Sequence, residues 1–344
     1  MGSAFMSLLV LANPFQPIDP VAVQQGLKKW VELIHLADTN RTLLLLHSNL
    51  IVRRDMIPSD SWNLLEEQAK LRLSVWNLIV DEISKIQSAL SEPGMRWMLV
   101  KTVRGLPREV RDVDILVFDD QLPALSEALR PLGYVQSGKL SGFKMELKTY
   151  RRLENGRKVP IALDVHSRIS YEGLSFLDEE DVWKNRRTAA LGGVSVSIPS
   201  PEHQLANCVL NSFFGDGGLR LGDVFEFSKL AREGTKTSFV RGIAKEYGWV
   251  SAHDLFLEKC SRYVHFLEGT SGRAGLSLVG DLVELPAGFD RNALLKGLLE
   301  KAKHDLGTGG KILVPSWGRV GMKFASRLGR GHIRKDTWSD IFAR

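Results

Sequence analysis

The sequence predicts an α+β fold, in which a small mixed β-sheet is flanked by N-terminal and C-terminal helical regions. Three observations lead to this prediction. Apolar residues recur at spacings of three and four through residues 61–90, which is the period of an amphipathic helix. Short apolar runs separated by turn residues then follow, as expected for strands. After Ser200-Pro201-Glu202 the pattern is helical again, because serine caps, proline in the first turn and an early acid all suit a helix start.

The N-terminal region is predicted to be helical up to about Ser91, and its clearest helix begins at Asp60 or Ser61 and ends before Pro93-Gly94. The apolar positions of that helix are Leu71, Val75, Leu78, Ile79, Ile83, Ile86 and Leu90. The whole chain is expected to divide into an N-terminal helical region (1–92), an α/β core (93–200), a C-terminal helical domain (201–304) and a basic tail (305–344).

Within the core, the order of elements predicts strands and one helix packed into a mixed sheet. The expected strands are Trp97–Val100, Val113–Val117, Phe143–Tyr150 and Val159–Ile169, with a helix over Leu122–Leu132 that Gly133 stops. Asn155-Gly156 is a strong hairpin turn signal. A second hairpin is expected at Ala190–Ile198, turned by Gly192-Gly193.

Composition sets the broad class of the protein. A chain of 344 residues with 44% hydrophobic residues is ordinary globular material. Its two cysteines, Cys208 and Cys260, lie far apart without metal-ligand spacing, which disfavours a disulfide framework and a zinc cluster. The apolar stretch Phe5–Ala12 is too short to span a bilayer. We therefore expect a soluble, cytoplasmic protein that does not enter a membrane.

The formal net charge is +6, which suits a polyanionic partner without proving one. The C-terminal tail is strongly basic and has no acidic residue between Asp305 and Asp336. Its basic residues are Lys311, Arg319, Lys323, Arg327, Arg330, Arg334 and Lys335. A solvated basic helix and an RNA or DNA contact surface both fit this pattern, and the solvated helix is the commoner outcome.

The run RDVDILV carries the main candidate site. Side chains alternate along a strand, so Asp112 and Asp114 point the same way. Two carboxylates on one face repel each other, and a hard divalent cation such as Mg²⁺ relieves that repulsion. In VPIALDVH, apolar residues alternate with Asp164 and His166, which places a third carboxylate on a strand that faces the same cleft. His166 shares this face, either as a substrate contact or as a structural histidine.

An acid-x-acid pair alone is weak evidence, because it also occurs in solvated turns. The ordered context strengthens it. LVKTVRGLPREVRDVDILV, a helix ending in Leu132-Gly133-Tyr134, and Leu163–His166 together resemble the DNA polymerase β-like nucleotidyltransferase superfamily. They are most similar to poorly characterised archaeal and bacterial nucleotidyltransferase-like proteins. The resemblance covers about Arg96 to Leu230.

The resemblance implies a nucleotidyltransferase core in which Asp112, Asp114 and Asp164 are catalytic residues that bind Mg²⁺ or Mn²⁺. It also implies that the loop before the acidic strand contacts the triphosphate. In the superfamily this loop usually carries a small Gly-Ser or Gly-Gly pair, which is Lys101-Thr102 here. The residues expected to bind the nucleotide are Lys101, Thr102, Arg104, Arg111 and His166.

The implied function is metal-dependent transfer of a nucleoside monophosphate from an NTP, such as ATP, to an acceptor hydroxyl on RNA, protein or a small molecule. Two alternatives remain open. One is a catalytically inactive protein of this fold that binds nucleic acid, and the other is a toxin-like enzyme that modifies tRNA. Arg220 and Asp223 are expected to form a helix-surface ion pair, and Tyr150, Trp183 and Phe214 to lie in the core.

Overall fold

The computed structural model describes residues 2–90, 94–103, 105–110, 112–136, 147–154, 157–171, 174–216, 218–269, 287–288 and 291–307. Several sequence predictions lie outside these residues. They are the Asn155-Gly156 turn, the Arg104 and Arg111 contacts, and all seven basic residues of the tail, namely Lys311, Arg319, Lys323, Arg327, Arg330, Arg334 and Lys335.

The N-terminal region is helical, as predicted. Four short helices come first: α1 (Gly2–Leu11), α2 (Pro20–Leu27), α3 (Trp30–Thr39) and α4 (Leu43–Leu50), followed by the 3-10 turn η1 (Ile51–Met56). The carboxylate of Asp19 caps α2 by accepting a hydrogen bond from the backbone N–H of Val21. These short helices pack on one another through leucines and Trp30, so their stability comes from packing more than from length.

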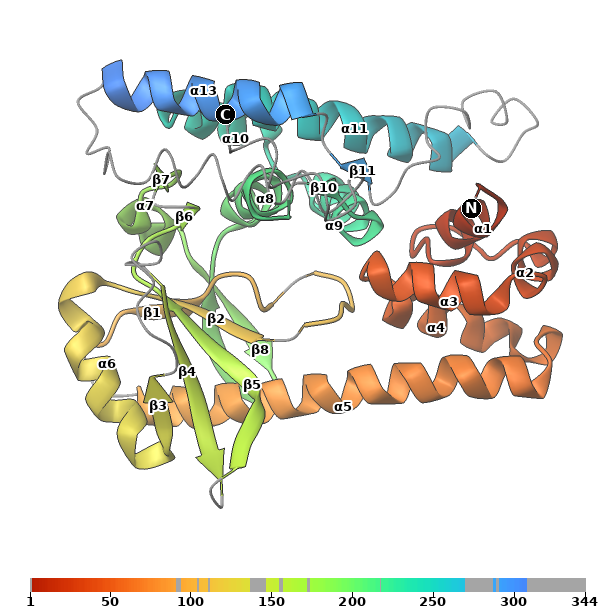
Figure 1. The fold of residues 1–344 in the computed structure, drawn as a ribbon, viewed down its shortest axis with the longest axis horizontal. Coiled ribbons are helices and arrows are strands. Elements are labelled where there is room, and N and C mark those ends of the chain that lie inside the picture. Colours follow the sequence, from red (N-terminus) through yellow and green to blue (C-terminus); the bar gives the residue numbers. More distant parts are fainter. Residues whose placement is uncertain are drawn as a thin grey trace, which may run out of the picture.

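Helix α5 (Ser59–Ala89) runs along one side of the molecule and joins its two halves (Figure 1). At about 1.5 Å per residue its 31 residues span about 45 Å. Trp62 and Leu65 at its start pack against the N-terminal helices, while Ile79, Ile83, Ile86 and Leu90 pack under the sheet. It begins at Ser59 after the N-cap residue Pro58, so the prediction of a cap at Asp60 or Ser61 was wrong by two or three residues.

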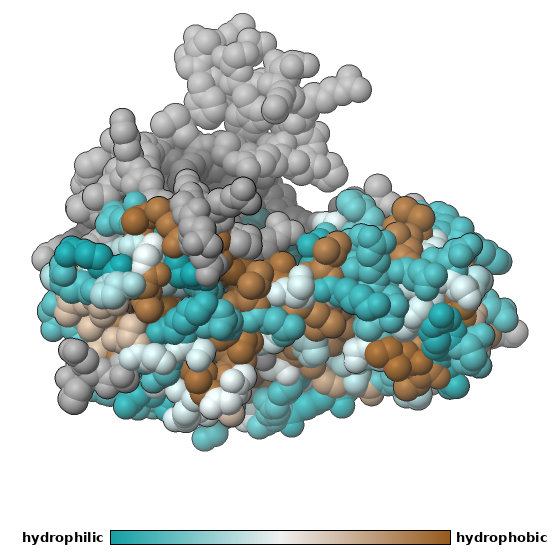
Figure 2. All heavy atoms as spheres, turned by 90° about the horizontal axis from the view of Figure 1, so that it is seen from below, coloured by the Kyte–Doolittle hydropathy of each residue, from teal (hydrophilic) through white to brown (hydrophobic). Residues whose placement is uncertain are grey.

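Between its two buried ends, α5 exposes hydrophobic side chains. Leu71 and Leu78, which belong to the apolar pattern of the sequence, are 51% and 41% exposed. Figure 2, which views the molecule from below, shows hydrophobic patches separated by hydrophilic surface on this side. The apolar pattern therefore predicted the helix correctly, but not every apolar position in it faces a core.

The sheet has five strands in the order β1-β2-β5-β4-β3. Their bounds are β1 (Trp97–Leu99), β2 (Asp112–Val117), β3 (Tyr134–Gln136), β4 (Leu147–Glu154) and β5 (Arg157–His166). Strands β2 and β5 are parallel and the other neighbours are antiparallel, which makes the sheet mixed, as predicted. Helix α6 (Leu122–Leu129), with the 3-10 turns η2 (Asp119–Gln121) and η3 (Arg130–Leu132), joins β2 to β3, and Gly133 ends it at φ +80°.

The two faces of the sheet differ. Val113, Ile115 and Val117 of β2 pack with α5 and α6 in one hydrophobic cluster. Leu116, on the opposite face, belongs to a second cluster that includes the N-terminal and C-terminal helices. Asp112 and Asp114 alternate with the first set and so lie on the same face as Leu116.

The second hairpin forms where it was predicted. It consists of β8 (Arg187–Leu191) and β9 (Val194–Ile198), and both glycines of its turn, Gly192 and Gly193, have positive φ angles (+55° and +85°). Before it lie the short strands β6 (Ser170–Tyr171) and β7 (Leu174–Ser175) and helix α7 (Glu179–Lys184). Ser200 then caps α8 by accepting the backbone N–H of His203, as the sequence predicted.

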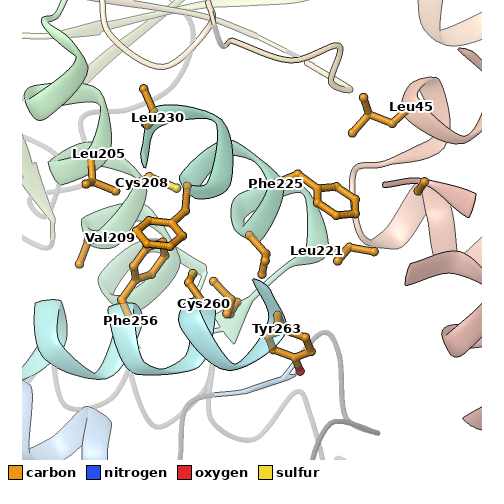
Figure 3. Packing of buried hydrophobic residues seen from close by; sticks show 14 of the residues in the cluster. Leu45, Leu205, Cys208, Val209, Leu221, Phe225, Leu230, Phe256, Cys260 and Tyr263 are labelled. Atoms are coloured by element: carbon orange, nitrogen blue, oxygen red, sulfur yellow. The ribbon is translucent and has the colours of Figure 1, made fainter. Parts of the chain in front are cut away.

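The C-terminal region is helical and lies above the sheet in Figure 1. Its elements are α8 (Pro201–Leu210), the π-helical turn η4 (Asn211–Asp216), α9 (Leu221–Arg232), α10 (Thr237–Glu246), α11 (Val250–Gly269) and α13 (Arg291–Gly307), with a two-stranded pair of β10 (Gly218–Leu219) and β11 (Ala287–Gly288). Figure 3 shows the buried side chains between α8, α9 and α11, with Leu45 of α4 lying on the far side of Phe225. The N-terminal and C-terminal helices therefore share one core.

Tyr150 and Phe214 are buried, as expected, and Trp183 packs at the edge of the core. Both cysteines are buried free thiols. In the part of the chain that the structure describes, no helix combines the length and the apolar character needed to cross a membrane. The predicted division into four regions stays a prediction.

Candidate nucleotidyltransferase-type site

Three carboxylates gather on the face of the sheet that lies opposite α5 and α6. Asp112 and Asp114 lie on β2, and β5 runs parallel beside it with Asp114 paired to Asp164 and Asp112 paired to Ala162. Paired residues of neighbouring parallel strands point to the same side of a sheet. The structure therefore places all three aspartates on one face of two adjacent strands, where the alternation in the sequence predicted them.

Asp114 is held from several sides. Its backbone N–H donates to the hydroxyl of Thr102 at 2.8 Å, and its carbonyl accepts the N–H of Val100 at 3.1 Å. Its carboxylate contacts Nε2 of His166 at 2.8 Å, and Nζ of Lys101 lies 3.9 Å away. The loop residues Lys101 and Thr102 are thus part of the site, but Thr102 is 1% exposed and its hydroxyl supports β2.

Asp164 receives a hydrogen bond from Thr149, a residue that sequence reasoning missed. The Thr149 hydroxyl donates to Oδ1 of Asp164 at 2.7 Å across the antiparallel pair of β4 and β5. Arg151 pairs with Ala162, which in turn pairs with Asp112, so Arg151 also lies on the carboxylate face. The signal that could have found both residues is their position at even spacing on the strand that pairs with β5.

The surroundings of the site shift the pKa values of Asp112 and His166. Burial, reinforced by the negative charges of Asp114 and Asp164, raises the pKa of Asp112 to about 6. Burial, with the neighbouring Lys101 ammonium, lowers the pKa of His166, which favours its neutral form at pH 7. The site thus concentrates acceptor oxygens in a place where water screens them poorly.

The donor set fits a hard cation in its chemistry. Carboxylate oxygens are the ligands that Mg²⁺ and Mn²⁺ prefer. The pKa of Asp112 is raised by burial and by repulsion from the neighbouring carboxylates, and a bound divalent cation would relieve that repulsion. The side chains as they stand do not form a cage. Among the described residues, no group of three or more acidic, histidine or cysteine side chains is arranged to hold a metal ion.

The loop between β1 and β2 ties the sheet to two helical regions (Figure 1). The N–H of Gly105 donates to Glu226 of α9 at 3.0 Å, and Oε1 of Glu109 accepts the N–H of Leu44, at the start of α4, at 3.1 Å. A Cβ atom at Gly105 would lie 2.8 Å from the end of the Lys229 side chain, so the loop packs closely against α9 here. The loop that leads into the acidic strand is therefore hydrogen-bonded to both α4 and α9.

The predicted surface ion pair between Arg220 and Asp223 was wrong. Asp223 is 1% exposed, and its Oδ1 accepts a hydrogen bond from the buried guanidinium of Arg108 at 2.8 Å. The backbone N–H of Arg220 donates to Oδ2 of Asp223 at 3.2 Å, while its guanidinium turns to Asp216 at 2.6 Å. Helical spacing alone suggested a local pair, but Asp223 faces the interior and meets a distant arginine.

Arg41, between α3 and α4, also belongs to this region, although no motif in the sequence marks it. It is the one non-glycine residue among those described with a positive φ, +57°. Its guanidinium lies 3.4 Å from Oδ2 of Asp216, and its positive charge offsets a small part of the rise in the pKa of Asp112. The N-terminal helices thus contribute a cation near the carboxylates.

Comparison with known proteins agrees with this picture. Residues 27–265, more than half of the chain, match the family described as "Uncharacterised nucleotidyltransferase". No curated protein matches the chain.

Solved structures that are similar to this chain include the lincosamide antibiotic adenylyltransferase LnuA bound to lincomycin. It shows 18% identity over 44% of this chain and 95% of that chain, with a TM-score of 0.32. A nucleotidyltransferase structure from H. pylori shows 16% identity over 66% of this chain and 96% of that one, with a TM-score of 0.30. JHP933 from Helicobacter pylori shows 15% identity over 71% and 96%, with a TM-score of 0.30.

Proposed function

The chain belongs to the uncharacterised nucleotidyltransferase family, whose match spans residues 27–265, and from this premise we propose the following reaction. The protein transfers a nucleoside monophosphate from an NTP to an acceptor hydroxyl and releases pyrophosphate. The observation that carries the proposal is the register of β2 with β5, which sets Asp112, Asp114 and Asp164 on one face.

The reaction exchanges one bond for another, and it needs a base and cationic groups from the protein. The acceptor oxygen forms a bond to the α-phosphorus as the bond from that phosphorus to the β-phosphate oxygen breaks, and pyrophosphate carries away the electron pair. The acceptor hydroxyl loses its proton, for which we propose the Asp164 carboxylate as the base. Cationic groups stabilise the phosphate oxygens. We propose Lys101 as one of these groups, because its Nζ lies 3.9 Å from Oδ1 of Asp114.

We propose that Asp112, Asp114 and Asp164 hold Mg²⁺ or Mn²⁺, because hard oxygen donors on one face suit these ions. When bound, such a cation would neutralise charge on the phosphate oxygens. His166, hydrogen-bonded to Asp114, orients that carboxylate. Thr149 does the same for Asp164.

The proposed partners are an NTP and, through the basic tail, RNA or DNA. The candidate carriers of the acceptor hydroxyl are RNA, protein and small molecules, and the position of the label in one assay distinguishes them. The four NTPs, each labelled at the α-phosphate, are incubated with the protein, Mg²⁺ or Mn²⁺, and total RNA or total protein. The double variant Asp112→Asn/Asp114→Asn is the control.

We expect metal-dependent labelling by the native protein and none by the double variant. Absence of transfer to every acceptor, together with absence of NTP binding, would refute the proposed function. Salt-sensitive nucleic-acid binding that survives the double substitution, without transfer, would instead support the inactive nucleic-acid-binding protein. Toxicity on expression that Asp114→Asn relieves, with label on tRNA, would support the toxin-like enzyme.

A further inference from the structure

One carboxylate oxygen beside the candidate site collects three donors. Oδ2 of Asp216 contacts Nη1 of Arg220 at 2.6 Å, Nδ2 of Asn211 at 3.2 Å and Nη2 of Arg41 at 3.4 Å. Asp216 ends the π-helical turn η4, a rare local geometry that is frequent at functional sites. Two guanidiniums and an amide that converge on one anionic oxygen form the kind of donor set that binds phosphate.

The arginines around Asp216 are crowded. Burial and the neighbouring guanidinium of Arg108, with a smaller contribution from that of Arg220, lower the pKa of Arg41 to about 10. Arg108 is itself buried, and within the described residues its Nη1 has no hydrogen-bond partner although Nη2 binds Asp223. Arg41 and Arg220 thus share the single carboxylate of Asp216, whereas Arg108 pairs with Asp223 and lies near the buried carboxylate of Glu226.

The backbone holds Arg41 in this place at a cost. A left-handed conformation is unfavourable for a residue with a side chain and persists where the surroundings impose it. The residue before Arg41 is held by the start of α9, because the N–H groups of Leu221 and Gly222 donate to the side-chain and backbone oxygens of Asn40 at 3.2 and 3.0 Å. Asn40, the neighbour of Arg41, thus caps the N-terminus of α9, the helix that follows Arg220.

The arginine cluster adjoins the carboxylates. Arg108 lies four residues before Asp112, in the loop that leads into β2, and it connects that loop to α9 through Asp223. Asp223, the partner of Arg108, also accepts the backbone N–H of Arg220 at 3.2 Å, so one carboxylate joins this loop to the residue that precedes α9. A ligand with a chain of phosphates could therefore reach from the aspartates to the arginines.

We propose that Arg41 and Arg220 bind the phosphate chain of the nucleotide, and that Asp216 occupies these two arginines until the triphosphate displaces it. This inference rests on the proposed function, since it assigns the triphosphate of that substrate to a second group of residues. It makes the N-terminal helical region part of the active site. It also explains why a strained arginine stands at the junction of α3 and α4 with α9.

The test measures binding of inorganic tripolyphosphate, ATP and AMP by titration calorimetry, with and without Mg²⁺. The variants are Arg41→Ala, Arg41→Lys and Asp216→Asn. The matched control is Arg72→Ala, because Arg72 pairs with Asp38 at 2.7 Å and its side chain is 30% exposed, as that of Arg41 is. Thermal unfolding checks that each variant is folded.

Loss of a charge-assisted contact should weaken tripolyphosphate and ATP binding about tenfold or more in Arg41→Ala, while AMP binding changes less than about twofold. Arg41→Lys, which keeps the charge but loses the planar fork, should lose about threefold or more and serves as the test if the alanine variant does not fold. Asp216→Asn should bind tripolyphosphate more tightly than the native protein. Arg72→Ala should bind as the native protein does.

Equal tripolyphosphate affinity in the Arg41 variants and Arg72→Ala would overturn the assignment of Arg41. Unchanged or weaker binding by Asp216→Asn would overturn the displacement by substrate.

Failure of this inference can be distinguished from failure of the proposed function. If the native protein transfers nucleotide normally while the Arg41 variants bind normally, only this inference is lost. If the native protein transfers nothing but Arg41→Ala still loses tripolyphosphate binding, the anion site stands and the transfer reaction falls.

Discussion

Asp114 and Asp164 lie in register on two adjacent parallel strands, on the face of the sheet that is not covered by α5 and α6. Asp112 stands two residues earlier on the same face. Such a group of partly buried like charges lowers the stability of a fold. The sheet tolerates it because the opposite face, rich in valine and isoleucine, packs fully against the helices.

Replacing Asp112 with asparagine should stabilise the protein at alkaline pH. The folded protein raises the pKa of this group from 3.8 to about 6, so its contribution to stability is present below pH 3.8 and is lost as the pH rises through 6. Asp112→Asn removes that loss. We expect a gain of about 1–3 kcal/mol at pH 8 and almost none near pH 4, measured by urea unfolding. An equal difference at both values would contradict the charge repulsion.

Replacing Thr102 with valine should loosen β2. The hydroxyl of Thr102 accepts the N–H of Asp114, so valine, which has the same shape, leaves that buried donor without a partner. The expected loss is about 1–3 kcal/mol in the free energy of unfolding, with a fall in transfer rate because Asp114 is no longer held in place. Thr102→Ser keeps the hydroxyl and should retain most of both. Equal behaviour of the two variants would show that the hydrogen bond has no such role.

Glu82 should be a strong point of attachment between α5 and the sheet. Its carboxylate accepts hydrogen bonds from Nε of Arg152 at 2.9 Å and from the hydroxyl of Tyr134, all buried. Glu82→Gln leaves the guanidinium of Arg152 buried without its counter-charge, which we expect to cost about 3–5 kcal/mol in thermal or urea unfolding. Glu127→Gln, in an exposed pair with Arg130, should cost less than about 1 kcal/mol. Similar losses in both would rule out this role.

Substitution of Gly222 by alanine should disturb the contact between the start of α9 and the backbone at Asn40 and Arg41. A Cβ there would lie 2.9 Å from the backbone oxygen of Arg41 and 3.0 Å from that of Asn40, so the two segments must separate. We expect about 1–3 kcal/mol of destabilisation and weaker tripolyphosphate binding. Gly242 lies in α10 with open space at its Cβ position, so Gly242→Ala should be neutral or stabilising by up to about 1 kcal/mol. An undisturbed Gly222→Ala variant would mean that this contact does not hold Arg41.

The acidic strand could be predicted because its signals are local. Alternation in β2 and β5 is enough to put Asp112, Asp114 and Asp164 on one face, and a family resemblance supplies the pairing of the two strands. The hairpin at Gly192-Gly193 and the cap at Ser200 follow from turn and capping chemistry in the same way.

The arginine cluster could not be predicted because its contacts are not local. Arg41 meets Asp216 and Arg108 meets Asp223 across gaps of more than one hundred residues, and neither pair has a spacing that a periodic pattern reveals. For the same reason the spacing of Arg220 and Asp223 was misleading. Leu71 and Leu78 followed the helical period but lie on the exposed middle of α5, where no layer covers them.

The most direct test of the central claim compares the native protein with Asp114→Asn in transfer of α-labelled nucleotide in the presence of Mg²⁺. Asparagine keeps the size of the side chain and removes the charge at the centre of the carboxylate group. We predict transfer by the native protein and a loss of at least about a hundredfold in the variant, with cooperative unfolding retained. Equal transfer rates in the two folded proteins would contradict the assignment of this site.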